Sequence, residues 1–353
     1  MHSPVRRNTH RLPRKRCQQV VLSVATLGLV TAGLVPVASA GLRPGPTQHR
    51  PHRTTIQQGM PTSAPNGSAV PTASPGAHPS PSSTSSAPQF ATASPPAPTA
   101  TGSSAWRGGF DGFGSTAWKR DWGVTPSGGW GWQDMAAVAD SEAPGGTALQ
   151  VTYGDRSSAP SCTDCPTSGG GQFYTSLDSL GLKSLASAST LDLKYRVKFP
   201  TGYDWGRAGK LPGLYGGKVG QASGGSHGGW STRFMWRGSS GTPDNGEVYL
   251  YTPTDSGPTG YGVDLAVGDW HWAADDRWHT VEQLVDRTSG DVTVWYDGEQ
   301  AASLPGIATG IASIPFSGIF FSTFYGGHDS TWGPAGTQHA YFADFSLSPG
   351  VQH

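Results

Sequence analysis

The sequence predicts an all-β fold, a two-sheet sandwich of the jelly-roll type, on three observations. From Trp106 onward, apolar and polar residues alternate with a period of two in many short runs. Clusters of Gly, Pro, Asp and Asn separate these runs, as is typical of turns between strands. No segment of this region keeps a helical period of 3.6 over three turns. Many short strands joined by Gly-rich turns therefore indicate two packed sheets.

The clearest predicted strand extends from Ser189 to Pro200, where apolar and charged residues alternate strictly. Its apolar face, which we expect to be buried, consists of Leu191, Leu193, Tyr195, Val197 and Phe199. Its other face, which we expect to contact water, consists of Asp192, Lys194, Arg196 and Lys198. The same pattern predicts further strands at residues 148–153, 172–177, 230–237, 247–252, 279–286, 291–297, 317–325 and 340–347.

Residues 1–40 are expected to form a secretory signal peptide. A basic run ends at Arg16, an apolar stretch extends from Val20 to Val37, and Ala38-Ser-Ala40 provides small residues for cleavage. The alternative is an uncleaved membrane anchor, but Ser, Thr and Pro interrupt a stretch that would need about 20 mostly apolar residues. The pair Arg6-Arg7 leaves both general and twin-arginine export open. We therefore expect a secreted, extracellular protein that has no membrane contact after cleavage.

Residues 41–105 are expected to be a disordered linker, and residues 106–353 a single folded domain. The linker consists mainly of Pro, Ser, Thr, Ala and Gly, which bury too little apolar surface to offset the entropy of ordering. The remaining 248 residues suffice for a core, and we expect a monomer.

The formal net charge of zero is a sum over unlike segments. Residues 1–105 contain nine basic residues and no acidic one, whereas the folded domain has 15 basic and 24 acidic residues, a net charge of −9. All 13 Trp residues lie in this acidic domain. Binding to nucleic acid in general rests on clustered Lys and Arg, so this class of function is excluded.

Cys162 and Cys165 form an isolated C-x-x-C motif. A zinc site would need a second pair of ligands nearby, and a redox site would need a βαβ setting. In an exported chain, the favoured interpretation is a local disulfide that closes a small loop. We expect no metal and no cofactor.

Two neighbouring predicted strands present cations and phenols on one face. In the strand Trp230–Arg237 the aromatic residues alternate with polar ones, and in Glu247–Thr252 two Tyr alternate with Val and Leu. Joined by a predicted turn at 238–246, these strands are expected to pair as a hairpin. The shared polar face would contain Ser231, Arg233, Arg237, Tyr249 and Tyr251.

Two further candidates flank this hairpin. Gly209–Gly217 has the composition of a loop and contains Lys210, and His227 immediately precedes the Ser/Arg strand. Taken singly, each of these residues is most often only solvated on a sheet surface or loop. Together, the cations and phenols indicate a site for a polyanion.

The sequence lacks the motifs of several other enzyme classes. The domain has only four Glu residues, and none forms an E-x-D-x-E strand that would supply the carboxylate pair of a glycosidase. No G-x-S-x-G elbow and no H-E-x-x-H motif are present. These absences favour chemistry that depends on cations and phenols.

These residues resemble polysaccharide lyase family 14, and they are similar to the glucuronan lyases of family 20. The resemblance extends from about Phe110 to Ser348. It rests on Lys210-Leu-Pro-Gly-Leu, Ser231-Thr-Arg233, Met235-Trp-Arg237, Tyr249-Leu-Tyr251-Thr-Pro, Val294-Trp-Tyr-Asp-Gly298 and Phe321-Ser-Thr-Phe-Tyr-Gly-Gly327. It implies a concanavalin-like jelly roll with a concave cleft, and β-elimination on a uronic-acid polysaccharide such as alginate or glucuronan. It also implies an anionic polysaccharide as the partner.

The resemblance implies catalytic roles for Lys210, Ser231, Arg233, Tyr249 and Tyr251. Substrate binding is expected of His227, Arg237 and Tyr325. Elimination requires that the C6 carboxylate is neutralised, the C5 proton is removed and the O4 leaving group is protonated. Arg233 suits the first role, with Ser231 beside it, while Lys210 or a Tyr is the base and Tyr249 or Tyr251 the acid. Such a base needs a lowered pKa, which neighbouring Arg residues would provide.

Two alternatives to an enzyme remain open from the sequence. The first is a carbohydrate-binding, lectin-like domain without turnover, in which exposed Trp residues stack on sugar rings. The candidates for that stacking are Trp130, Trp132, Trp270 and Trp272, although packing inside the sandwich is the favoured interpretation for most of them. The second is a structural surface protein displayed on its Pro-rich linker.

Overall fold

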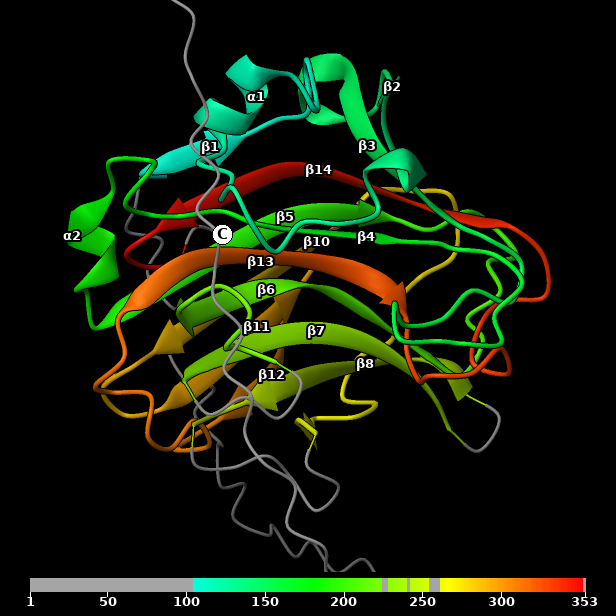
Figure 1. Ribbon diagram of the computed structural model, residues 1–353. Helices are drawn as coiled ribbons and strands as arrows, with labels where there is room; N and C mark the ends of the chain where they lie inside the picture. Colours follow the sequence, from blue (N-terminus) through cyan, green and yellow to red (C-terminus); the bar gives the residue numbers. More distant parts are fainter. Residues whose placement is uncertain (1–103, 224–227, 240–241, 254–260, 352–353) are drawn as a thin grey trace, which may run out of the picture. The chain divides into compact units, whose positions relative to one another are not determined.

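The computed structural model describes residues 104–223, 228–239, 242–253 and 261–351 (Figure 1). The predicted signal peptide, residues 41–103 of the predicted linker and the predicted substrate-binding residue His227 lie outside the described residues. Within the described part of the chain, no helix is both long and apolar enough to cross a membrane.

The described domain consists of two antiparallel sheets, which confirms the predicted all-β sandwich. The strands of the first sheet are β1 (Trp106–Gly108), β2 (Met135–Ala139), β3 (Thr147–Tyr153), β5 (Thr190–Lys198), β10 (His279–Asp286), β11 (Asp291–Tyr296), β12 (Glu299–Leu304) and β14 (Gln338–Ser348). They lie in the order β12-β11-β10-β5-β14-β3-β2, and β1 also pairs with β14. All the longer predicted strands are present, with ends that differ by a few residues.

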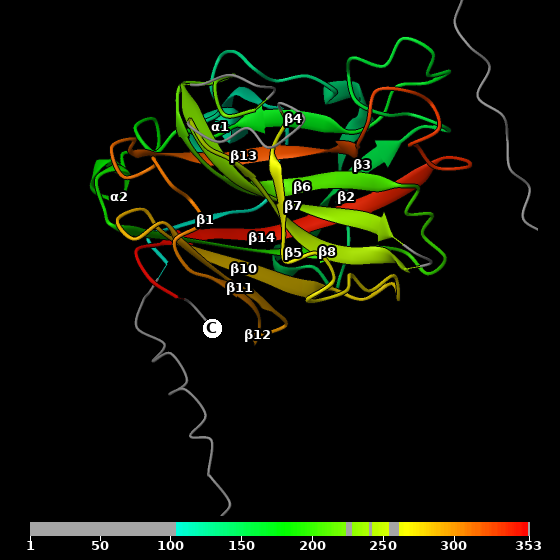
Figure 2. The same cartoon turned by 90° about the horizontal axis from the view of Figure 1, so that it is seen from below.

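The second sheet has six strands and includes the hairpin expected from the sequence. Its strands are β4 (Gly171–Tyr174), β6 (Ala208–Gly217), β7 (Gly229–Ser239), β8 (Thr242–Tyr251), β9 (Val263–Leu265) and β13 (Phe316–Tyr325). Their order is β4-β13-β6-β7-β8-β9. Figure 2 shows the two layers, with β13 and β6 in one and β14, β5 and β10 in the other. The helices are short: α1 (Thr116–Asp121), α2 (Lys183–Ala186), η1 (Trp132–Asp134) and η2 (Pro144–Gly146).

The core lies between the sheets and is dominated by aromatic side chains. From β7, the predicted aromatic face points inward, and Trp230, Phe234 and Trp236 are fully buried. From β5, Tyr195 packs toward Phe234 with ring centroids 6.4 Å apart. Each large apolar side chain buried in this way stabilises the fold by roughly 1.5–3 kcal/mol. Since one set of alternate residues forms the core, the other set is directed to the opposite side of each sheet. The expectation that Asp192 of β5 contacts water there is wrong, because this residue is fully buried.

The prediction of a loop at Gly209–Gly217 is wrong, because this segment is the central strand β6. Its glycines make room for Trp side chains of β7. A Cβ on Gly209 would lie 1.9 Å from the Trp236 ring, and one on Gly216 would lie 2.1 Å from Trp230 Nε1. The proline in this strand, Pro212, lies at a register shift, where its missing N–H interrupts no regular pairing.

The predicted turn at 238–246 is also wrong, because both strands of the hairpin extend into it. Strand β7 continues to Ser239 and β8 begins at Thr242, and these two residues pair. Gly246 permits the close packing of Trp270, whose ring a Cβ would meet at 2.0 Å. In residues 209–217 and 238–246, the glycines named above therefore lie against aromatic rings and do not mark turns.

Candidate active site

The predicted catalytic residues lie on the side of the six-stranded sheet that faces away from the core, which we call the site face. Strand register places Gly213 of β6 opposite Arg233 of β7, and Arg233 opposite Tyr249 of β8. Ser231 is opposite Tyr251 in the same hairpin. Opposite residues in an antiparallel pair share a face, so the pairing brings together groups that are far apart in sequence.

Arg233 is a buried cation that has no carboxylate partner among the residues that the structure describes. Its residue is only 2% exposed, and one Nη donates to Ser322 Oγ at 3.3 Å. The guanidinium carbon lies 4.4 Å from the ring centroid of Phe320 and 5.6 Å from that of Tyr251. Nε is buried and has no hydrogen-bond partner among the described residues. Burial lowers the pKa of Arg233, but a guanidinium stays protonated at neutral pH.

Lys210 lies beside Arg233 and is likewise in no ion pair within the described part of the chain. The residue as a whole is partly exposed, but its ammonium end is enclosed. Nζ lies 3.4 Å from the ring centroid of Tyr249 and donates to Met235 Sδ at 3.2 Å. Burial, followed by repulsion from Arg233, lowers the pKa of Lys210 well below its usual value. The neutral amine is therefore accessible at a lower pH than for a free lysine.

Tyr249 and Tyr251 form an edge-to-face pair with ring centroids 5.3 Å apart. Both are buried, with 8% and 5% exposure. Burial, and next the adjacent Tyr251, raises the pKa of Tyr249. Tyr249 is consequently a phenol rather than a phenolate at physiological pH, and it has a proton to donate.

Ser231 is fully buried, and its hydroxyl donates to the Ala222 carbonyl oxygen at 2.7 Å. This bond fixes the segment around Ala222 to the end of the hairpin. The structure thus places Ser231 on the site face, in register with Tyr251, with its own proton already donated to the backbone.

Arg237, expected to bind substrate, already has two carboxylate partners. Its Nε donates to one carboxylate oxygen of Glu247, and an Nη donates to the other at 3.1 Å. The same Nη donates to Asp264 Oδ1 at 2.7 Å. Burial raises the pKa of Glu247 to about 7, and the contact with Arg237 opposes that rise. The charge of Arg237 is thus matched within the protein, whereas Arg233 has no such carboxylate partner in the described part of the chain.

The structure does not bring Tyr325 to the site face, contrary to its expected role in substrate binding. Tyr325 is fully buried in the core, and its hydroxyl donates to the Asp204 carbonyl oxygen. The alternate residues of β13 reach the site face instead, namely Phe320 and Ser322. Alternation in this strand was obscured because nearly every residue on both faces is aromatic, Ser or Thr.

The sequence analysis missed two polar residues that support Arg233. Ser322 Oγ, which accepts from Arg233, donates to Gln172 Oε1 of β4 at 3.1 Å. Gln172 Nε2 in turn donates to the Gly128 carbonyl oxygen at 2.8 Å. The sequence offered one signal: Ser322 lies between Phe321 and Thr323, and in a strand its side chain points to the face opposite theirs.

The Trp residues considered for sugar stacking are in different environments. Trp270 and Trp272 belong to the core, with 6% and 1% exposure, so they pack inside the sandwich and are not candidates for sugar stacking. Trp132 stacks on buried Phe173, with ring centroids 5.8 Å apart. Trp130 is half-buried and contacts Phe324 with ring centroids 5.6 Å apart.

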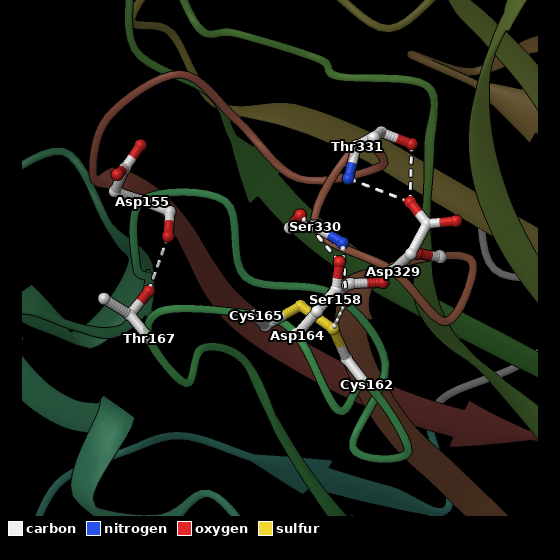
Figure 3. The surroundings of a disulfide bond; sticks show 10 residues. Asp155, Ser158, Cys162, Asp164, Cys165, Thr167, Asp329, Ser330 and Thr331 are labelled. Carbon is white, nitrogen blue, oxygen red and sulfur yellow. Dashed lines mark hydrogen bonds between the residues drawn. A yellow bond between two sulfur atoms is a disulfide. The ribbon is translucent and has the colours of Figure 1, made fainter.

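Cys162 and Cys165 form the disulfide expected from the sequence (Figure 3). Asp164, between them, accepts from the backbone N–H of Ser330 at 3.2 Å and from its hydroxyl at 3.1 Å. The disulfide loop is thereby tied to the connection between β13 and β14. Among the described residues, Cys162, Asp164 and Cys165 are also the one group spaced as metal ligands, but both sulfurs belong to the disulfide.

The fold and the site face define a β-sandwich protein in which buried Arg233 has no carboxylate partner among the described residues and lies beside Lys210, whose pKa is lowered. The family model described as polysaccharide lyase 14 matches residues 141–345, more than half of the chain. The chain therefore belongs to polysaccharide lyase family 14, as the resemblance predicted, and is a polysaccharide lyase. Comparison with curated protein sequences gave no significant match.

Several solved structures of lyases are similar to this chain. The PL-14 alginate lyase from Aplysia kurodai is 24% identical with a TM-score of 0.56, covering 70% of this chain and 99% of that one. The alginate lyase Aly36B is 18% identical with a TM-score of 0.50, covering 69% and 95%. The endo-β-1,4-glucuronan lyase from the fungus Trichoderma reesei is 11% identical with a TM-score of 0.45, covering 70% and 95%.

Proposed function

We propose that this protein is a secreted lyase that cleaves a uronic-acid polysaccharide of the alginate or glucuronan class by β-elimination. The observation that supports this most strongly is Arg233, a buried guanidinium without a carboxylate partner in the described part of the chain, beside Lys210, whose lowered pKa makes a neutral amine accessible. A buried cation is costly unless an anion completes its environment. A uronate carboxylate supplies that anion, and alginate is the substrate named for the lyase from Aplysia kurodai.

Arg233 binds and neutralises the C6 carboxylate of the sugar unit that loses its C5 proton. Neutralisation makes the C5 proton more acidic and stabilises the negative charge that develops as the proton leaves. The hydrogen bond to Ser322 and the contact with Phe320 hold the guanidinium in place before substrate arrives. One preorganised donor of this kind typically contributes about 3–4 kcal/mol to transition-state stabilisation.

Lys210 is the general base. Its lowered pKa makes the neutral amine accessible, and that amine takes the C5 proton and becomes an ammonium group. The electron pair of the C5–H bond forms the C4–C5 double bond as the C4–O4 bond breaks. The nearby ring of Tyr249 then stabilises the new ammonium charge through a cation–π contact.

Tyr249 is the general acid, with Tyr251 as the alternative. The raised pKa of Tyr249 keeps its hydroxyl protonated, and that proton goes to the departing O4. The resulting phenolate lies beside the ammonium group of Lys210, from which it regains a proton. The cycle thus leaves both residues in their initial protonation states.

The test is turnover of purified protein on polymannuronate, polyguluronate, glucuronan and hyaluronan, followed by ultraviolet absorbance of the unsaturated uronyl product. We expect absorbance to rise with at least one uronic-acid polymer, and Lys210→Ala to reduce the rate by roughly 10²–10⁴. Binding without absorbance on every polymer would instead identify a carbohydrate-binding domain without turnover. Full activity of Lys210→Ala would remove Lys210 from the mechanism.

Secretion is a separate part of this proposal, and it rests on the basic and apolar segments of residues 1–40. Expression of the full chain in a bacterial host, followed by N-terminal sequencing of protein from the medium, tests it. A mature N-terminus at or near Gly41 is expected, and retention of Met1 on a membrane-bound protein would contradict it.

A further inference from the structure

A cavity of about 490 Å³ lies beside the site face, between Trp130 and the disulfide loop. One wall is the segment from Trp130 to Asp134, and the other is the loop from Ser158 to Gly169 that contains Cys162 and Cys165. The mechanism proposed above uses none of these residues. The cavity is of the size that holds a small organic ligand.

Strand register connects this cavity to the catalytic residues. Trp130 pairs with Gln172 in an isolated antiparallel bridge, and Gln172 pairs with Ser322. Ser322 accepts the hydrogen bond from Arg233. Since paired residues share a face, Trp130 lies on the site face, in one row with Gln172 and Ser322. Arg233 belongs to the neighbouring row, which runs through Gly213 and Phe320. Four strand spacings, about 19 Å across the sheet, separate the strand of Arg233 from Trp130.

An aromatic contact joins the two sites more directly. The indole of Trp130 packs against Phe324, which is paired with Lys210 across β13 and β6. Trp130 also lines the cavity and remains half-buried. The rings of Phe324 and Trp130 therefore lie between Lys210 and the cavity, where a polymer bound at the catalytic residues can contact them.

The cavity lining favours hydroxyl groups over anions. Asp134 is the one charged residue in the lining, which contains no Lys or Arg. Its carboxylate accepts from Ser168 Oγ at 3.3 Å and from Gln133 Nε2 at 3.0 Å, and an ionised carboxylate has further acceptor positions. An indole plane beside hydrogen-bonding groups matches a sugar ring, which has an apolar C–H face and a rim of hydroxyls.

We propose that the cavity between Trp130 and the disulfide loop is a distal sugar subsite, which binds one unit of the polysaccharide through its ring face and hydroxyls. The carboxylate of that unit, if present, points away from Asp134. The disulfide and the contacts of Asp164 with Ser330 hold the loop in place, so little ordering accompanies binding. The subsite rests on the proposed lyase function, because the polysaccharide that occupies the cavity is the substrate of that lyase.

The test compares Trp130→Ala with the wild-type protein on polymer and on a size ladder of oligosaccharides. We expect kcat/KM to fall about 5- to 10-fold on polymer and long oligosaccharides, and to remain unchanged on the shortest oligosaccharides that are cleaved. Trp278→Ala is the matched control, since Trp278 is also half-buried but lies over the other sheet beside Lys198. Equal loss on all lengths, or no loss on any, would overturn the subsite.

A second measurement separates the subsite from the lyase function. Calorimetric titration with a long uronate oligosaccharide is performed on the wild-type protein, Trp130→Ala and Asp134→Ala. We expect both variants to bind the oligosaccharide more weakly than the wild-type protein. The titration is repeated with the same oligosaccharide after its carboxyl groups have been reduced. If both substitutions still weaken binding, the cavity recognises hydroxyl groups. If wild-type protein binds but does not cleave, the lyase function fails while the subsite stands. Unaltered affinity in both variants overturns the subsite.

Discussion

The ammonium group of Lys210 lies 3.4 Å from the centroid of the Tyr249 ring, and this contact joins the proposed base to the proposed acid. Burial moves the two pKa values in opposite directions, down for Lys210 and up for Tyr249, because it disfavours the charged form of each group. Both groups are thereby neutral over a wider pH range than in water. A neutral amine beside a neutral phenol is the arrangement that proton removal and proton donation require.

Lys210→Met should reduce turnover by roughly 10²–10⁴, as Lys210→Ala does, but stabilise the fold. A lysine whose pKa is lower in the folded state binds fewer protons there, so it costs stability at neutral pH, and the cost decreases as pH rises toward 10.5. Removing it should raise the free energy of unfolding at pH 7 by about 1 kcal/mol or more. Urea denaturation at pH 7 and pH 10 measures this, with the exposed Lys183→Met as control. A less stable Lys210→Met protein at pH 7 would contradict the argument.

The pH profile of the wild-type enzyme should show an acid limb set by Lys210. We expect kcat/KM to rise with pH and to level off below pH 10.5, since the lowered pKa releases the amine before a free lysine would. Initial rates across a range of buffers at constant ionic strength provide the measurement. A rate maximum near pH ~5 would exclude a lysine base.

Arg233→Lys should reduce kcat/KM by roughly 10²–10³, because an ammonium group keeps the charge but loses the planar donor pair for a carboxylate. The measurement is the initial rate of product absorbance on the preferred polymer. Arg196→Lys, on the outer side of the other sheet, is the matched control and should keep wild-type activity. Wild-type kinetics in Arg233→Lys would show that the guanidinium does not hold the substrate carboxylate.

Tyr249→Phe and Tyr251→Phe distinguish the acid from its neighbour. We expect Tyr249→Phe to lower kcat by about 10²–10⁴ and Tyr251→Phe to have a smaller effect, because Tyr249 is in contact with Lys210. A uronoside with fluoride at C4, which leaves without a proton, should be cleaved by Tyr249→Phe nearly as fast as by the wild type. Failure of that substrate to restore the rate would assign Tyr249 another role.

Protonation of His279, which lies in the other sheet and away from the active site, should make the free energy of unfolding depend on pH. Its ring nitrogens contact Asp297 at 2.6 Å and Asp275 at 2.9 Å, and although burial opposes protonation, these bonds raise its pKa. The stabilisation is therefore complete below about pH 6.5 and disappears as pH rises through the higher, folded-state pKa. His279→Gln should thus destabilise more at pH 6 than at pH 9 in urea titrations. The exposed His328→Gln serves as control, and an equal loss at both pH values would contradict this account.

Gly209→Ala should destabilise the domain by about 1–3 kcal/mol, because the added Cβ would lie 1.9 Å from the Trp236 ring. Displacement of Trp236 would also shift β6 and with it Lys210. Thermal unfolding and turnover are measured together. Gly109→Ala, where a Cβ meets nothing within 4 Å, is the matched control. A Gly209→Ala protein as stable as the control would show that β6 tolerates the added group.

The sequence was sufficient for the sandwich and for the Arg233 hairpin, because alternation in β5, β7 and β8 shows which residues face the core. It did not show that the other face of β7 and β8 is buried as well. It failed at β6, where Gly and Pro have the composition of a loop although the strand is central. In β6, the glycines leave room for the side chains of Trp230 and Trp236 on the neighbouring strand. The sequence around each glycine does not reveal this contact.

The same distinction holds within the active site. The residue types that perform elimination, and their period-two spacing on one hairpin, are properties of the sequence. Which cations carry a carboxylate partner was decided by tertiary structure, since Glu247 and Asp264 neutralise Arg237, whereas Arg233 contacts no carboxylate among the described residues. Tertiary structure also moved Tyr325 into the core. Charge pairing and burial depend on strand order and register, which bring together residues from distant segments, whereas alternation depends only on neighbours along the chain.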